Sequence, residues 1–193
     1  MRIELPYNRE RAVEYARRWA LSRNPLFIDF TGRGGDCTSF VSQCVFAGTG
    51  VMNYTETFGW YYISSQNRAP AWAGVDEFFA FITGAPEFVA ANGGTGPRGS
   101  DVTDASQIEI GDVIQLQNDR GEFYHSLLIS EITDDDILIC AHSDDALDRP
   151  ISTYNYAALR VIHIERATVD LELDSAFQNI LDGISLPMPI GIQ

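Results

Sequence analysis

The chain of 193 residues contains no lysine; all 13 of its basic residues are arginine, against 27 acidic residues, and the formal net charge is −14. Proteins that bind nucleic acid follow the phosphate backbone with basic patches, so this charge argues against a nucleic-acid partner. An anionic membrane surface is disfavoured for the same reason. The absence of lysine fits a compositional bias of the host, or selection against lysine modification in a translocated protein.

Long hydrophobic runs are also missing. No apolar stretch approaches the ~20 residues of a membrane-spanning helix, so we expect no membrane span. The first residues, MRIELPYN, lack the apolar centre of a signal peptide, and we expect no export signal in this chain. Length and an apolar content of 45% are ordinary for a folded protein, and we expect one domain over residues 1–193.

Cysteine and histidine are scarce, with three of each. Three cysteines cannot form a complete disulfide framework, and the chain has no Cys-x-x-Cys pair. The spacing of the cysteines and histidines matches no zinc-finger pattern. We therefore expect no metal site.

The glycine-rich sequence GRGGDCTSFVSQCVFAG, residues 32–48, is the most informative stretch of the chain. Asp36 can cap a helix, and Gly48 suits the left-handed residue that ends one. This interpretation places Cys37 at the first helical position, where free N–H groups and the helix dipole favour the thiolate, although the adjacent Asp36 carboxylate opposes that effect. The alternative is a buried cysteine that begins a core helix. Cys44, two turns further along, is expected in the core.

Further helices are predicted on both sides of this one. Asn8 can cap a helix over residues 9 to about 23, and an apolar pattern predicts a short helix over residues 75–83. An amphipathic helix is predicted over residues 170–181, followed by a proline-rich tail over residues 186–193.

Residues 49–73 are rich in aromatic side chains without a clear period. A packed irregular loop and one wall of a binding cleft are equally good interpretations of this segment. Under the second interpretation, the cleft candidates are Trp60, Tyr61 and Trp72, together with Tyr124 further along the chain. Residues 92–106 are rich in Gly, Asp, Ser and Thr and predict an exposed loop.

After this loop the apolar period becomes that of strands, which are predicted over residues 110–117, 123–132, 137–142 and 159–164. Short turns join the first three strands, so these form an antiparallel meander. Helices followed by strands indicate the α+β class.

The meander relates two of the histidines, while His163 on the last strand is given no role. A turn of even length, over residues 133–134 or 133–136, places His125 and His142 on the same face of the sheet, and a bulge would break this relation. That face would also carry Leu127, Ile129, Leu138 and Cys140. We expect the helix that begins at Cys37 to pack there, which brings a thiol near one imidazole with a second behind it. The alternative is two satisfied histidines in a half-buried sheet.

Four sequences together resemble a known family. GDCTSFVSQ at residues 35–43 resembles the helix signature of the putative amidase-domain family, part of the papain-like superfamily of NlpC-type and CHAP-type bacterial cell-wall peptidases and amidases. GDVI at residues 111–114, HSLLI at 125–129 and AHSD at 141–144 resemble its strand opening, its histidine strand and its third-residue strand. The likeness covers about residues 6–164.

The resemblance implies a papain-like fold, with the catalytic cysteine at a helix N-terminus that packs on an antiparallel meander. The catalytic region would be about residues 6–164, followed by a helix and tail over residues 165–193. It implies a cysteine amidase or endopeptidase, acting on peptidoglycan stem peptides or a similar amide in the bacterial cell envelope or outside the cell. No metal or organic cofactor is required.

Site residues are carried over by position. Cys37 is the nucleophile, His125 the base and His142 the orienting residue, with Asp144 as the alternative third residue. The helix start, Asp36 and Cys37, supplies a backbone N–H for the oxyanion. The family's usual DCTN is DCTS here, and Tyr124 stands where Asp commonly precedes the histidine.

Two other functions remain open at this point. The same residues can serve a transferase that passes the acyl group to an amine. A binding domain without catalysis would instead use the aromatic segment, residues 54–72, to hold a glycan or a protein.

Overall fold

The fold is of the α+β class, with helices packed against one antiparallel sheet, as expected from the sequence. The computed structural model describes residues 1–170 and 181–182. The helices are α1 (Arg9–Trp19), α2 (Cys37–Thr49), α3 (Pro70–Ala73), α4 (Val75–Thr83) and α5 (Pro86–Asn92). The strands are β1 (Arg2–Pro6), β2 (Gly96–Val102), β3 (Val113–Gln117), β4 (Phe123–Ile132), β5 (Ile137–Ala141), β6 (Ala146–Pro150) and β7 (Ala158–Asp170). Two short 3-10 helices are η1 (Ala105–Gln107) and η2 (Ile151–Thr153).

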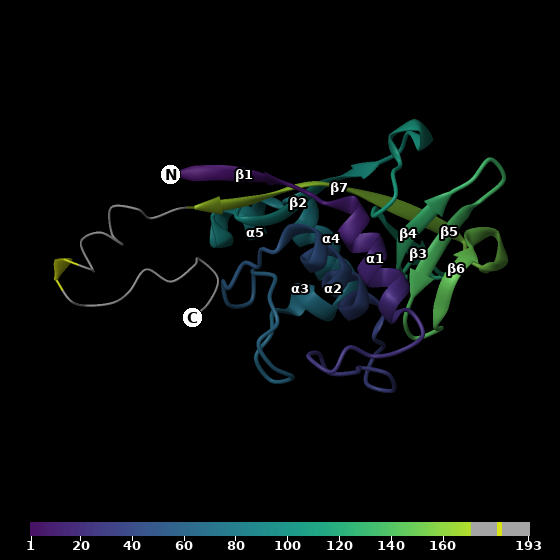
Figure 1. Cartoon of the computed structure of the whole chain (residues 1–193), viewed down its shortest axis with the longest axis horizontal. Coiled ribbons are helices and arrows are strands. Elements are labelled where there is room, and N and C mark those ends of the chain that lie inside the picture. The colour runs from purple at the N-terminus through teal and green to yellow at the C-terminus, as the bar shows by residue number, and fades with distance from the viewer. Residues whose placement is uncertain (171–180, 183–193) are drawn as a thin grey trace.

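The strands form a sheet in the order β1-β7-β3-β4-β5-β6, and β2 also pairs with β7. Figure 1 shows β7 running along the sheet beside both β1 and β2. The predicted meander is β3-β4-β5, and every strand pair in the described residues is antiparallel. The sheet therefore places β4, which carries His125, between β3 and β5.

The sheet has two apolar faces. One packs against the helices, and we call it the helix face; it carries Val113, Leu128 and Cys140, in one cluster with Phe40 and other helix residues. We call the opposite side the outer face, which carries Leu116, Leu127, Ile129 and Ile139. Figure 1 shows α1 and α2 beside the β3-β4-β5 part of the sheet.

Helix α2 begins where the sequence predicts it but ends two residues later. Gly50, with φ of 67°, is the left-handed residue at its end. The prediction that Gly48 ends the helix is wrong. A Cβ atom at Gly48 would lie 2.3 Å from the Tyr7 ring, so glycine is needed there for close packing.

Other elements differ from the prediction. Helix α1 is capped by the Asn8 side chain as expected, but it ends at Trp19 rather than near residue 23. Strand β2 occupies the predicted exposed loop over residues 92–106, because it pairs with the extended β7. Strands β1 and β6 and helices α3 and α5 were not predicted.

The predicted C-terminal elements are not tested. Strand β7 continues to Asp170, where the predicted helix over residues 170–181 would begin. Most of that helix, and the tail over residues 186–193, lie outside the described residues. In the described part of the chain, no helix is long and apolar enough to cross a membrane.

Candidate active site

The candidate site is built around the first turn of α2. Cys37 is the first residue of this helix, is 6% exposed and forms no disulfide. Gly34 and Gly35 precede it with φ values of 104° and 105°, which only glycine adopts readily. The glycine-rich loop therefore turns sharply and places the thiol at the helix start.

Asp36 does not cap α2 with its side chain, contrary to the expectation from the sequence. Its Oδ1 accepts the Phe30 N–H at 3.1 Å, and its Oδ2 lies 2.6 Å from His142 Nδ1 and 3.6 Å from Arg23 Nε. Its own N–H donates to Ser143 Oγ at 2.6 Å. The carboxylate thus ties the loop to β5 and α1, and it leaves the first N–H groups of α2 without a side-chain cap.

His142 is fully engaged in this contact. Its Nε2 lies 2.8 Å from the carbonyl oxygen of Trp19, the last residue of α1, and its ring stacks on Phe40 at 3.9 Å between centroids. Both ring nitrogens of His142 therefore have a partner, the Asp36 carboxylate at Nδ1 and the Trp19 carbonyl at Nε2.

His142 is therefore not in contact with His125, and the reason is a β-bulge. The turn spans residues 133–136, one of the two predicted lengths, and Ile132 pairs with Ile137. The register then shifts between Ile129 and Glu131, so that Leu128 pairs with Cys140. A shift of one residue moves every following side chain to the other face.

The prediction that the two histidines share a face is consequently wrong. His142 lies on the helix face, where it stacks on α2. His125 pairs with Leu116 and lies two residues before Leu127 on the same strand. Its side chain therefore projects from the outer face, as those of Leu116 and Leu127 do. Leu127 and Ile129, which were expected under the helices, are also on the outer face.

His125 is buried, at 6% exposure, beside Tyr124 and Tyr154, whose ring centroids lie 6.0 Å and 6.1 Å from its own. Its Nε2 is buried and has no hydrogen-bond partner. Burial lowers the pKa of His125 to about 4; the Asp144 carboxylate opposes this shift and the Arg149 guanidinium adds to it. At neutral pH the ring is uncharged and can accept a proton.

The residues that follow Cys37 and His125 join the two elements. Thr38 Oγ1 and Ser126 Oγ form a buried hydrogen bond of 2.9 Å between α2 and β4. Gln115 of β3 donates to the same Ser126 Oγ at 3.2 Å. The described residues contain no hydrogen bond between the Cys37 thiol and the His125 ring; Sγ lies 3.9 Å from Thr38 Oγ1.

Thr38, Ser126 and Gln115 were not predicted as part of the site. Thr38 and Ser126 stand inside the two quoted motifs, directly after Cys37 and His125. Their position was visible in the sequence, but their pairing depends on how α2 docks on the sheet.

Asp144, the alternative third residue, is exposed and accepts from Arg149 at 2.7 Å. Its neighbour Ser143 holds the Asp36 N–H, so the turn after β5 connects the start of α2 with the surroundings of His125. Tyr124 is 45% exposed and donates from its hydroxyl to the Asn155 carbonyl at 3.3 Å. It lies at the rim of the site.

The aromatic cleft candidates on residues 49–73 lie elsewhere. Trp60 and Trp72 have no exposed surface, and their rings pack on each other at 5.0 Å in the helix-side core. Tyr61 is 7% exposed. These side chains are packed in the core, as one of the two interpretations expected, although Trp72 lies in the short helix α3 and not in a loop. We do not keep them in the site.

Asp112 of the GDVI sequence is buried, and its contacts join neighbouring elements of the fold. It accepts from Arg9 Nη1 at 2.6 Å and from the Ile164 N–H at 3.1 Å. His163, to which the sequence assigns no role, is partly buried and lies 2.9 Å from the same carboxylate. This cluster joins α1, β7 and the start of β3.

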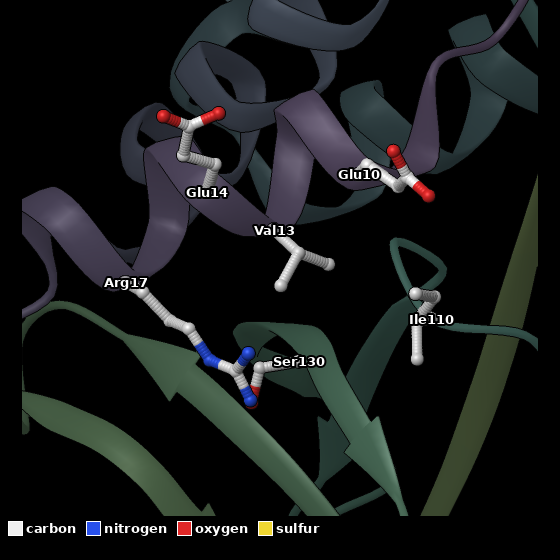
Figure 2. A pocket seen from close by; sticks show the side chains of 6 residues that line it. All are labelled: Glu10, Val13, Glu14, Arg17, Ile110 and Ser130. Carbon is white, nitrogen blue, oxygen red and sulfur yellow. The ribbon is translucent and has the colours of Figure 1, made fainter.

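A separate pocket lies between α1 and β4, with a volume of about 380 Å³ (Figure 2). Val13 and Ile110 give it an apolar surface, and its other lining residues are Glu10, Glu14, Arg17 and Ser130. Arg17 is occupied by ion pairs with Glu131 and Asp148. The pocket contains neither a cysteine nor a histidine and is not part of the candidate site. Within residues 1–170 and 181–182, no group of His, Cys, Asp and Glu is arranged to hold a metal ion.

Comparisons with known proteins agree with the extent of the quoted motifs. Residues 6–164 match the family described as "Putative amidase domain". The chain is 27% identical over 128 residues to "Uncharacterized protein YhbB" of Bacillus subtilis (strain 168), an alignment that covers 64% of this chain and 37% of that protein. No solved structure matches the chain. The chain belongs to the putative amidase domain family.

Proposed function

We propose that the chain is a cysteine-dependent amide hydrolase of the papain-like type, with Cys37 as nucleophile and His125 as base. The Thr38–Ser126 hydrogen bond carries this proposal, because it fixes the start of α2 against β4 one residue beyond each of the two groups. Cysteine hydrolases require a thiol at a helix start within reach of a histidine, and this hydrogen bond brings together the two backbone segments that carry Cys37 and His125.

The surroundings of Cys37 support a thiolate. The first turn of α2 offers N–H groups and the positive end of the helix dipole. The Asp36 carboxylate would repel a thiolate, but it is in contact with the His142 ring at 2.6 Å and lies 3.6 Å from Arg23 Nε. Because this charge is compensated, the helix start keeps its preference for an anion.

The reaction then follows in two steps. His125 accepts the thiol proton, and Sγ attacks the amide carbonyl carbon while the Cys37 N–H stabilises the oxyanion. The carbon–nitrogen bond breaks, and the amine leaves with the proton that His125 returns. Water, deprotonated by His125, hydrolyses the thioester and restores the thiol. Hydrogen bonds between catalytic groups are often long or poorly aligned before substrate binds, and they tighten in the complex.

The proposed substrate is an amide in peptidoglycan stem peptides or a similar peptide. This rests on the resemblance of the helix and histidine sequences to cell-wall peptidases and amidases, and it places the activity in the cell envelope or outside the cell. The test is digestion of purified peptidoglycan with mass analysis of the fragments. We expect new amine and carboxylate ends with the wild type and none with Cys37→Ala; equal fragments from both proteins would contradict the mechanism.

The same experiment separates hydrolysis from transfer. Digestion in the presence of an added amine yields acylated amine if the thioester is passed to amines rather than to water. A binding domain without catalysis would leave the polymer intact and bind equally well after Cys37→Ala. The burial of Trp60 and Trp72 removes the main surface on which such a binding role was based.

A further inference from the structure

Two polar atoms near His125 are buried without partners. They are Nε2 of His125 itself and the hydroxyl oxygen of Tyr154, which follows η2. A buried polar atom without a hydrogen bond is costly, and most such atoms in proteins are paired. The two rings lie side by side, with 6.1 Å between their centroids and 40° between their planes. The two unpaired atoms therefore lie in the same part of the molecule.

The Tyr154 ring is held firmly. Arg149 lies over its face, 4.0 Å from the centroid. The guanidinium is itself fixed by Thr153, which accepts from Nε at 2.9 Å, and by Asp144, which accepts from Nη1 at 2.7 Å. Tyr154 also packs against the outer-face cluster, the side from which His125 projects. The position of the hydroxyl is therefore set by the fold.

We propose that Tyr154 is the positioning residue of His125, and that its hydroxyl oxygen accepts a hydrogen bond from Nε2–H in the free protein in solution as well as during turnover. This inference rests on the proposed function of Cys37 and His125. It assigns to Tyr154 the orienting role that the resemblance gave to His142, whose two ring nitrogens are occupied by Asp36 and Trp19.

The chemistry requires such an acceptor. A neutral imidazole carries one proton, and the ring can accept the thiol proton at Nδ1 only if its own proton is on Nε2. An acceptor beside Nε2 favours that tautomer and stabilises the imidazolium that forms after proton transfer. Asp144 is the competing acceptor, but its carboxylate is exposed and occupied by Arg149.

The test combines nitrogen NMR of His125 with steady-state kinetics of Tyr154→Phe, which keeps the ring and removes only the hydroxyl. Tyr156→Phe is the matched control, since Tyr156 packs on the same cluster two residues along. Asp144→Asn tests the competitor. Thermal unfolding of each variant checks that the fold is retained.

We expect the Nε2–H tautomer in the wild type and in Tyr156→Phe, and a mixture of tautomers in Tyr154→Phe. The kcat of Tyr154→Phe should fall about tenfold with KM nearly unchanged, because one neutral hydrogen bond to the base is lost. Unchanged tautomers and kcat in Tyr154→Phe, with both altered in Asp144→Asn, would overturn the inference.

The role of Tyr154 and the proposed function of Cys37 and His125 are contradicted by different results. The NMR measurement needs no substrate, so an unchanged tautomer in Tyr154→Phe overturns the role of Tyr154 even where Cys37→Ala abolishes turnover. Full activity of Cys37→Ala would instead overturn the proposed function.

Discussion

His142 and His125 are both buried, at 1% and 6% exposure, but the fold satisfies only one of them. His142 has a carboxylate on one nitrogen, a carbonyl on the other and an aromatic ring against its face. His125 has a buried Nε2 without a partner and a lowered pKa. A histidine whose hydrogen bonds are all used holds structure together, whereas one left unsatisfied is available for proton transfer.

Replacing each histidine by alanine should reveal the largest difference between them in the free energy of unfolding. His142→Ala leaves the buried Asp36 carboxylate without its histidine partner, and loss of one partner of a buried pair costs about 3–5 kcal/mol. His125→Ala removes a ring with an unpaired nitrogen and should cost less, while abolishing turnover. Urea unfolding and peptidoglycan digestion of both variants measure this. If His142→Ala is as stable as the wild type, the structural role of the pair is wrong.

The comparison also predicts how stability depends on pH. Burial holds the pKa of His125 at about 4, below the ordinary value of 6.5. Between these two values the unfolded chain binds a proton at this residue that the folded protein does not, so the free energy of unfolding falls as pH drops from 6.5 towards 4, by about 3 kcal/mol in total.

His125→Ala removes this contribution and should therefore lose less stability over that range. Urea unfolding at pH 7 and pH 4.5 gives the difference for each protein, and the carboxylates that titrate in both proteins cancel in the comparison. Parallel losses in the two proteins would show that His125 is not buried as described.

The smallest effect concerns the hydrogen bond that joins the two regions. Thr38→Val keeps the shape of the side chain and removes its bond to Ser126, which should cost about 1 kcal/mol and lower kcat/KM several-fold. Thr49→Val is the matched control, because Thr49 bonds only to Val45 within α2 at the opposite end of the helix. Equal activity of the two variants would mean that the Thr38–Ser126 contact does not position Cys37.

Local sequence was enough for much of the fold. The Asn8 cap, the start of α2 at Cys37, the bounds of α4 and the bounds of β4 all follow from short-range patterns, and each is confirmed. Helix α5 also carried a readable signal, with Pro86 at its first turn and the left-handed Gly93 after its end.

The parts that could not be predicted depend on long-range pairing. The bulge between Ile129 and Glu131 has no distinctive residue in the sequence, yet it separates the two histidines. Tyr154 lies 29 positions from His125, outside the quoted motifs, and only the docking of η2 brings their rings together. Strand β2 exists because β7 is long enough to pair with it.

The most direct test of the central claim is the reactivity of the Cys37 thiol. Brief labelling with a small haloacetamide over a pH series, followed by peptide mass spectrometry, compares the three cysteines in the folded protein. Burial raises the pKa of Cys44 and of Cys140, so these two should stay unmodified until the protein is denatured. Cys37 should react at about pH 6, where an ordinary thiol is almost wholly protonated. His125→Ala should shift its profile to higher pH; labelling of Cys37 no faster than that of free cysteine, in both proteins, would contradict the account.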